Sequence, residues 1–68
     1  MKESDELFFQ KIEDYLPPYK REIFRLHLEG YSDYQISQSL AIEVNKIKKI
    51  LSDIKKKITS LLRQGKIQ

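Results

Sequence analysis

The sequence lacks cysteine and tryptophan and contains a single histidine, His27. Without cysteine the chain has neither disulfide bonds nor thiolate metal ligands, and one histidine cannot supply the ligand set of a zinc site. We therefore expect no metal and no cofactor. Two glycines and two prolines leave no glycine-rich loop that would cradle a phosphate. No nucleophile–base pair or catalytic carboxylate dyad is recognisable, so an enzyme is not expected.

Long hydrophobic runs are also missing. No apolar run approaches the roughly 20 residues of a transmembrane helix, and no signal-peptide pattern opens the chain. We therefore expect a cytoplasmic location and no membrane partner. The 68 residues are expected to form one domain, 1–68. A domain of this size buries only about 60% of its unfolded surface, so its stability has to come from helix packing or from a partner.

Charge is divided unevenly along the chain. Residues 1–45 hold five basic and nine acidic side chains, a net −4, whereas residues 46–68 hold eight basic side chains against Asp53 alone, a net +7. A basic end on an otherwise acidic molecule is typical of proteins that bind a polyanion such as nucleic acid. The alternative is a lysine-rich face that only keeps a helix in solution.

Proline and glycine divide the first half of the chain into two predicted helices. Ser4 or Asp5 is expected to cap the first helix, which runs to about Tyr15. Pro17 ends that helix, and Pro18 starts a second one that extends to about residue 29, before the stop signal of Gly30. The residues predicted to face the core are Leu7, Phe8, Ile12, Tyr15 and Leu16 in the first helix, and Ile23, Phe24, Leu26 and Leu28 in the second.

Ser32 is a good cap for a short third helix over residues 33–40, and the turn 41–43 then leads to a long fourth helix. From Val44 the apolar residues recur every three or four positions and form one continuous face of about six turns. Its members are Val44, Ile47, Ile50, Leu51, Ile54, Ile58, Leu61 and Leu62. Ile67 extends this face and is expected to cover the first helix around Phe8 and Phe9. The predicted fold is an all-α, four-helix domain with a helix-turn-helix and a long C-terminal recognition helix.

The opposite face of the fourth helix carries an amide and several cations. The same periodicity places Asn45, Lys49, Ser52, Lys56 and Arg63 there, with Lys46 and Lys57 on one flank and Lys48 and Lys55 on the other. Asparagine pairs with adenine and lysine donates to guanine in the major groove, while flanking cations meet phosphates. A solvent-facing amphipathic helix, a coiled-coil strand and a helix on an anionic membrane share parts of this pattern.

Three segments of the chain form a pattern in register. They are Leu16-Pro17-Pro18 followed by Arg21-Glu22-Ile23-Phe24; Gly30-x-Ser32-x-x-x-Ile36-Ser37-x-x-Leu40-x-Ile42; and Val44-x-Lys46-Ile47-Lys48 with Leu51, Ile54 and Ile58. Together they resemble region 4 of bacterial sigma factors, of the extracytoplasmic-function type. The resemblance covers roughly residues 7–62. The double proline favours sigma factors over the similar output domains of LuxR-type regulators. Ser37 stands where the family has alanine, and Ala41 replaces the usual glycine of the turn.

This resemblance implies a domain whose recognition helix enters the major groove of the promoter's −35 element. The positions matching base-reading residues are Asn45, Lys49 and Val44. The positions expected at the DNA backbone are Lys46, Lys48, Ser52, Lys56, Arg21 and Arg25, with Lys20 beside them. The family also implies docking on the β-subunit flap of RNA polymerase. No counterpart of sigma region 2 occurs, so the domain is expected to be excised from a longer factor or to act alone, with an anti-sigma factor or split-sigma subunit as a further partner.

Two functions of different classes follow. The first is sequence-directed binding of double-stranded promoter DNA during transcription initiation. The second is a protein-interaction module that binds RNA polymerase or a sigma or anti-sigma partner, with DNA contact incidental.

Overall fold

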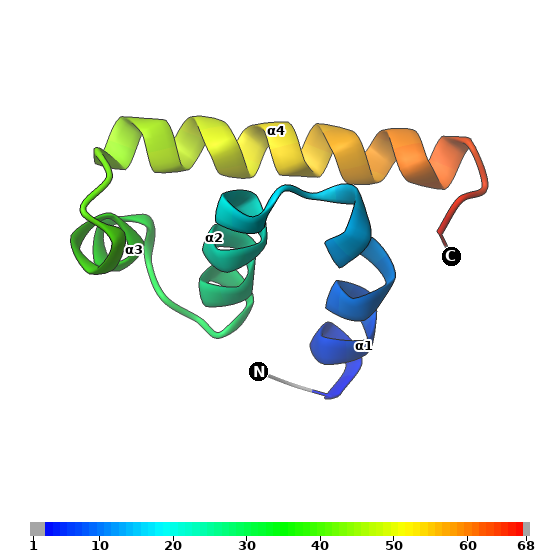
Figure 1. Ribbon diagram of the computed structural model, residues 1–68, viewed down its shortest axis with the longest axis horizontal. Helices are drawn as coiled ribbons and strands as arrows, with labels where there is room; N and C mark the ends of the chain where they lie inside the picture. The colour runs from blue at the N-terminus through cyan, green and yellow to red at the C-terminus, as the bar shows by residue number, and fades with distance from the viewer. Residues whose placement is uncertain (1–2, 68) are drawn as a thin grey trace.

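A long C-terminal helix organises the molecule. The computed structural model describes residues 3–67, which contain four α-helices, one short 3₁₀-helix and no β-strand. The elements are α1 (Glu3–Ile12), η1 (Glu13–Tyr15), α2 (Pro18–Leu28), α3 (Asp33–Leu40) and α4 (Val44–Arg63). In Figure 1, α1, α2 and α3 all lie on one side of α4. With a rise of about 1.5 Å per residue, α4 is about 30 Å long and spans most of the 35 Å long axis. The predicted all-α, four-helix architecture is confirmed.

The bounds of α2 follow from local rules. Leu16 is extended (φ −117°, ψ 138°) because the residue before a proline avoids the helical region, and Pro18 occupies the first turn of α2. Gly30 follows the helix with φ +99°, which permits the N–H of Tyr31 to donate to the carbonyl of Leu26 at 3.2 Å. This backbone pattern is a Schellman motif. The predicted end near residue 29 is correct to within one residue.

The prediction for the first helix is partly wrong. Glu3 is already helical, so Ser4 and Asp5 lie inside the first turn of α1 and neither of them is its N-cap. The α-helix ends at Ile12, and the chain tightens into η1 over residues 13–15 instead of continuing as α-helix to Tyr15. The turn into Pro17 requires an extended Leu16, and a last turn of 3₁₀-helix leads to it.

The core is made of aliphatic side chains from every α-helix. Five isoleucines, Ile12, Ile23, Ile36, Ile47 and Ile54, are at most 1% exposed. The other buried apolar residues are Leu16, Phe24, Ile50, Leu51, Leu61 and Ile67. The Phe9 ring, which lies 6.3 Å from that of Phe24 between centroids, joins α1 to α2. The predicted inward face of α4 therefore forms one wall of the core.

Three residues that were predicted to face inward are exposed. Leu7 is 53%, Tyr15 39% and Leu62 49% exposed. Helical periodicity assigned them to the apolar side of their helices, but no neighbouring element extends far enough to cover them. A domain this small has too few elements to bury every apolar residue.

The C-terminal segment folds back toward α1. Gly65 follows α4 with φ +69°, and the N–H of Lys66 donates to the carbonyl of Leu61 at 3.0 Å, again as in a Schellman motif. Ile67 is thereby buried and joins the core, and the segment borders a surface depression shared with Lys11 of α1. Ile67 is buried as expected, and Lys11 is the residue of α1 that borders the same depression; the expected position of Ile67 over Phe8 and Phe9 stays a prediction. Within residues 3–67, none of the helices has the length and apolar content that crossing a membrane requires.

Candidate nucleic-acid interface

The start of α3 is fixed by a reciprocal pair of hydrogen bonds. Ser32 Oγ accepts from the N–H of Gln35 at 3.1 Å, and Gln35 Oε1 accepts from the N–H of Ser32 at 2.9 Å. This capping box satisfies two backbone donors that a helix N-terminus otherwise leaves unpaired. The predicted cap at Ser32 and the bounds of α3, Asp33–Leu40, are confirmed.

A three-residue turn joins α3 to α4 and contains a left-handed alanine. Ala41 has φ 55° and ψ 42°, a conformation that favours glycine because the alanine Cβ crowds the backbone. Ser37 forms hydrogen bonds with both backbone polar groups of Ile42 in this turn. Its carbonyl accepts from the N–H of Ile42 at 3.1 Å, and its buried hydroxyl donates to the Ile42 carbonyl. The two residues that differ from the sigma pattern, Ser37 and Ala41, thus meet in the same turn, and the serine hydroxyl offsets part of the strain of the alanine.

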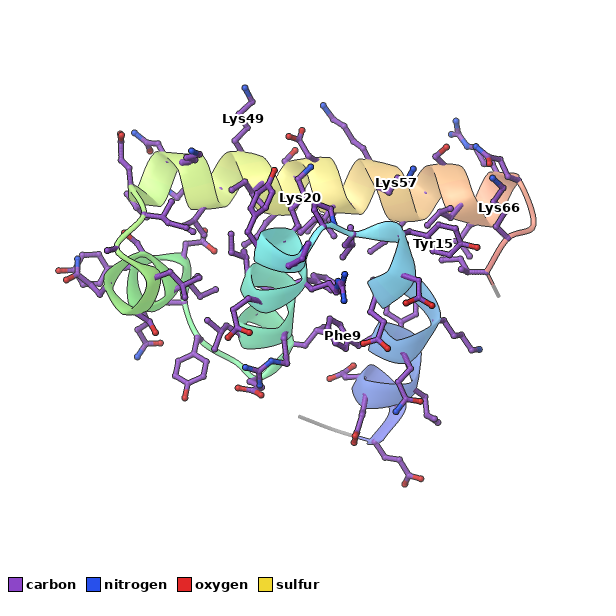
Figure 2. All side chains as sticks on the ribbon, viewed as in Figure 1. Phe9, Tyr15, Lys20, Lys49, Lys57 and Lys66 are labelled. Atoms are coloured by element: carbon purple, nitrogen blue, oxygen red, sulfur yellow. The ribbon has the colours of Figure 1, made fainter. Side chains whose placement is uncertain are left out.

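The outward face of α4 is free of the other helices. Asn45, Lys49, Ser52 and Lys56 are all exposed, and we name them the reading ridge. In Figure 2 the side chain of Lys49 points away from α1, α2 and α3. The ridge begins at the second residue of α4, next to the turn, so the α3–α4 junction sets its orientation.

The flanking cations of α4 are exposed as well. Lys46 and Lys48 border the start of the reading ridge, and Lys55 and Lys57 border its later part. No lysine of α4 forms an ion pair with another of the described residues 3–67; the two ion pairs there join Arg25 to Glu22 and to Glu29. Their charge is therefore available to an external anion.

Val44 is placed differently from the other predicted base-reading residues. It is half-buried at the first position of α4, on the side of the helix that also carries the buried Ile47 and Leu51. Part of the Val44 side chain packs against the core. Only its remaining exposed part can contact a DNA base.

Arg21 is engaged within the fold. Its Nε donates to the Leu16 carbonyl at 2.9 Å and so links the first turn of α2 to the residue that precedes the double proline. No carboxylate of residues 3–67 forms an ion pair with it. The expected alternatives for Arg21 were a DNA phosphate and an internal carboxylate. Only Nε has an acceptor in the fold; Nη1 and Nη2 form no hydrogen bond within residues 3–67, so contact with a DNA phosphate stays a prediction for Arg21.

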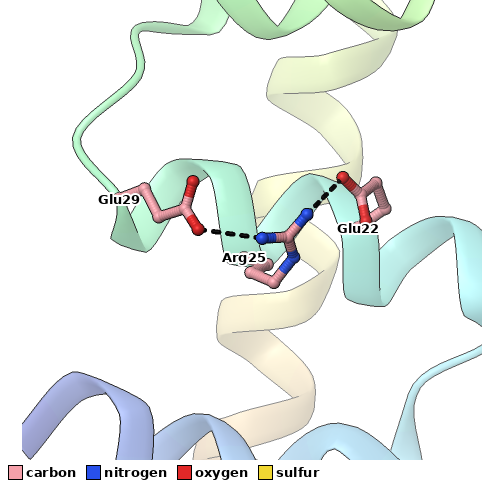
Figure 3. Close-up of polar contacts among 3 residues, drawn as sticks. All are labelled: Glu22, Arg25 and Glu29. Carbon is pink, nitrogen blue, oxygen red and sulfur yellow. Dashed lines mark hydrogen bonds and ion pairs between the residues drawn. The ribbon is translucent and has the colours of Figure 1, made fainter. Parts of the chain in front are cut away.

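Arg25 is held by two carboxylates of its own helix region (Figure 3). Its Nη2 lies 2.8 Å from Glu22 Oε1, and its Nη1 lies 2.9 Å from Glu29 Oε1. The hydrogen bond and the charge of Glu22, followed by the charge of Glu29, raise the pKa of Arg25. This triad carries one positive and two negative charges, which disfavours a phosphate beside it, so Arg25 is left out of the DNA contacts proposed below. The spacings i−3 and i+4 are the sequence signal for this pairing.

Lys20 lies closer to the fourth helix. It is half-buried in the first turn of α2, and Figure 2 shows it at the end of α2 that meets α4. Of the three basic residues that were predicted to reach the DNA backbone from α2, only Lys20 has no hydrogen bond or ion pair within residues 3–67.

Two other surface features bear on function. The described residues contain no cluster of three or more histidine, cysteine or acidic side chains that would hold a metal ion. Between α2 and α3 lies an apolar depression of about 290 Å³, lined by Leu26, Tyr31, Tyr34, Gln35, Ile36, Gln38 and Ser39. Tyr34 is 65% exposed at its rim.

Comparison of the chain with models of known protein families, with curated proteins and with solved structures gives no significant match. The geometry of α3 and α4 and the sequence resemblance are therefore the features that point to a function.

Proposed function

We propose that this domain binds double-stranded promoter DNA through α4, with α3, the turn and α4 acting as a helix-turn-helix of the sigma region 4 kind. In this arrangement the reading ridge enters the major groove of a −35-like element. Asn45 and Lys49 contact base edges, and Lys46, Lys48, Ser52 and Lys56 contact phosphates. Docking on the β-subunit flap of RNA polymerase belongs to the same proposal, as does an anti-sigma or split-sigma partner.

The observation that carries this proposal is the reading ridge itself. It combines an amide and lysines on a helix face that no other element covers, and α3 lies beside the start of that helix, on the side of α1 and α2 (Figure 1). An asparagine amide pairs with the N6 and N7 atoms of adenine, and lysine donates to the O6 and N7 atoms of guanine. In helix-turn-helix proteins the base contacts come from the N-terminal part of the recognition helix, where Asn45 and Lys49 lie.

The test compares a set of labelled duplexes that carry varied −35-like sites with a random duplex, at two salt concentrations. Wild type is expected to prefer some sites, and Asn45→Ala and Lys49→Ala are expected to lose about 1–3 kcal/mol of discrimination each while keeping the fold. Lys57→Ala on the flank of α4 is the matched control. Equal binding of all duplexes by wild type and both ridge variants would reject the assignment of base-reading residues.

The second candidate is a protein-interaction module, and the apolar depression between α2 and α3 favours it. Tyrosine is enriched at the centres of protein interfaces, and Tyr31 and Tyr34 line this depression while remaining largely exposed. This candidate predicts binding to RNA polymerase that survives neutralisation of Lys48 and Lys49 and is lost in Tyr31→Ala or Tyr34→Ala.

A further inference from the structure

A second surface lies on the C-terminal half of α4, beyond the bases that the proposed function assigns to Asn45 and Lys49. It is an open depression of about 420 Å³ lined by Ser52, Lys55, Lys56, Thr59, Ser60 and Arg63, which we name the C-terminal groove. These positions recur at intervals of three and four residues, so they follow one stripe of the helix. Its lining combines three small hydroxyl residues with three long cationic side chains, and it shares Ser52 and Lys56 with the reading ridge.

The charge of this groove is uncompensated. Lys55, Lys56 and Arg63 are exposed and form no ion pair within residues 3–67. The only acidic residue of α4 is Asp53, which does not line the groove. A stripe with three cations and no carboxylate attracts an anion along its whole length.

The hydroxyl residues of the C-terminal groove supply additional hydrogen-bonding groups. Thr59 Oγ1 donates to the Lys55 carbonyl at 3.1 Å, and Ser60 Oγ accepts from Gln64 Nε2 at 3.0 Å. Each of these hydroxyl oxygens keeps further hydrogen-bonding capacity, and the Ser52 hydroxyl has no partner among the described residues. Phosphate oxygens in DNA complexes accept from lysine, arginine, serine and threonine. The hydroxyl and cationic residues of the groove are spread along the helix, and the groove is open to solvent. An extended polyphosphate chain therefore fits them better than a single small anion does.

The length of α4 places the groove over the DNA backbone. Lys49 and Arg63 are 14 residues apart, which corresponds to about 21 Å along the helix axis, whereas the major groove is about 12 Å wide. A straight helix with Asn45 and Lys49 at the bases cannot keep its second half within the groove, which curves around the duplex. Because the C-terminal groove lies on the same side of α4 as the reading ridge, that second half meets the phosphates at the groove wall.

We propose that the C-terminal groove binds the sugar–phosphate backbone of DNA beside the bases that the reading ridge contacts. This inference rests on the proposed function, since the reading ridge sets the position of α4 on the duplex. The groove contributes affinity without sequence preference, and it lengthens the footprint beyond the base-reading turns of the helix.

The test is a salt titration of duplex binding with charge-matched variants of the full chain. The groove variant is Lys55→Gln/Arg63→Gln, which leaves Lys56 of the reading ridge unchanged. The control variant, Lys57→Gln/Lys66→Gln, removes the same net charge from exposed positions outside the groove. Affinity for a preferred and a random duplex of about two helical turns (~20 bp) is measured by fluorescence anisotropy across a salt series. A thermal melt verifies that both variants are folded.

We expect the slope of log K against log salt to fall by about 1.5–2 in the groove variant and by less than about 0.5 in the control. Affinity of the groove variant is expected to fall about tenfold or more at ~0.1 M salt, equally for both duplexes. Equal slopes in the two variants, with the preference for one duplex retained, would overturn the groove and leave the proposed function intact. A wild type without preference, whose salt slope falls only in the groove variant, would support the groove and reject base reading. No binding by wild type at low salt would overturn both.

Discussion

The two faces of α4 have opposite environments. On the inward face, Ile47 and Ile54 are at most 1% exposed and belong to the core to which all four α-helices contribute. On the outward face, Lys49 and Lys56 are exposed and form no ion pair within residues 3–67. One face therefore supplies the stability of the domain and the other is free to bind. Substitutions on the two faces are expected to have separable effects, and this separation can be tested.

The largest effect is expected from Ile47→Ala on the inward face. Ile47 is completely buried, and removing its side chain leaves a cavity in a thin core. We expect a loss of about 3–4 kcal/mol in the free energy of unfolding, most of what a domain of this size has. Urea denaturation followed by circular dichroism measures the change. Lys49→Ala on the outward face is the matched comparison and is expected to change stability by less than about 0.5 kcal/mol. Similar losses in both variants would contradict the division between the two faces.

A smaller loss of stability is expected from Ile67→Ala. Ile67 lies in the C-terminal segment that folds back on α1 after Gly65 and is 6% exposed. Because this segment is at the edge of the core, we expect a loss of about 2 kcal/mol, at the low end for a buried isoleucine. DNA affinity below the melting temperature should stay at the wild-type value. A weakened affinity with an intact fold would mean that the end of α4 contributes to binding through its packing on α1.

A substitution in the turn before α4 is expected to raise the free energy of unfolding. Ala41→Gly relieves the left-handed strain at φ 55° but increases the freedom of the unfolded chain. The net result is expected to be a gain of about 0.5–1 kcal/mol, measured by thermal denaturation. In the background of Ser37→Ala, which removes the hydroxyl that donates to the Ile42 carbonyl, we expect a larger gain from the same glycine. Destabilisation by Ala41→Gly would show that the turn is held without strain.

The smallest effect is expected from Arg25→Gln. The carboxylates Glu22 and Glu29 raise the pKa of Arg25 above its already high ordinary value. The stabilisation that this shift reflects is fully present below the ordinary pKa and is lost only at more alkaline pH, so none of it varies between about pH 6 and 9. Because the triad is largely exposed, the variant should lose about 0.5 kcal/mol or less. DNA affinity should stay within about a factor of two of wild type, and a loss as large as that in Lys49→Gln would return Arg25 to the interface.

Much of the fold could be predicted from local sequence signals. Pro18, Ser32 and the turn after Leu40 gave the starts of α2, α3 and α4, because proline at the first helical position, a serine cap and a change of periodicity act within a few residues. The reading ridge followed from the same periodicity. The start of α1 was predicted wrongly. Serine and aspartate are residue types that favour the N-cap position, but the residue type alone does not determine where a helix begins.

The candidate site was predicted less completely than the fold. Asn45 and Lys49 are exposed as expected, whereas Arg25 is taken by carboxylates whose spacing in the sequence would have revealed the pairing. The C-terminal groove includes Thr59 and Ser60, which were not singled out. Their signal is the repeat of hydroxyl and cationic residues every three or four positions between Ser52 and Arg63.

The sequence by itself determined the helical segments, the apolar and polar faces of α4 and the basic C-terminal half, because these properties depend on residues within a few turns of one another. Only the tertiary structure decided which apolar residues are covered. Leu7 and Leu62 are exposed although their positions favoured burial, whereas Ile67 is buried because Gly65 turns the chain back onto α1. Periodicity assigns a residue to one side of a helix, but burial depends on how far the neighbouring elements extend over that side.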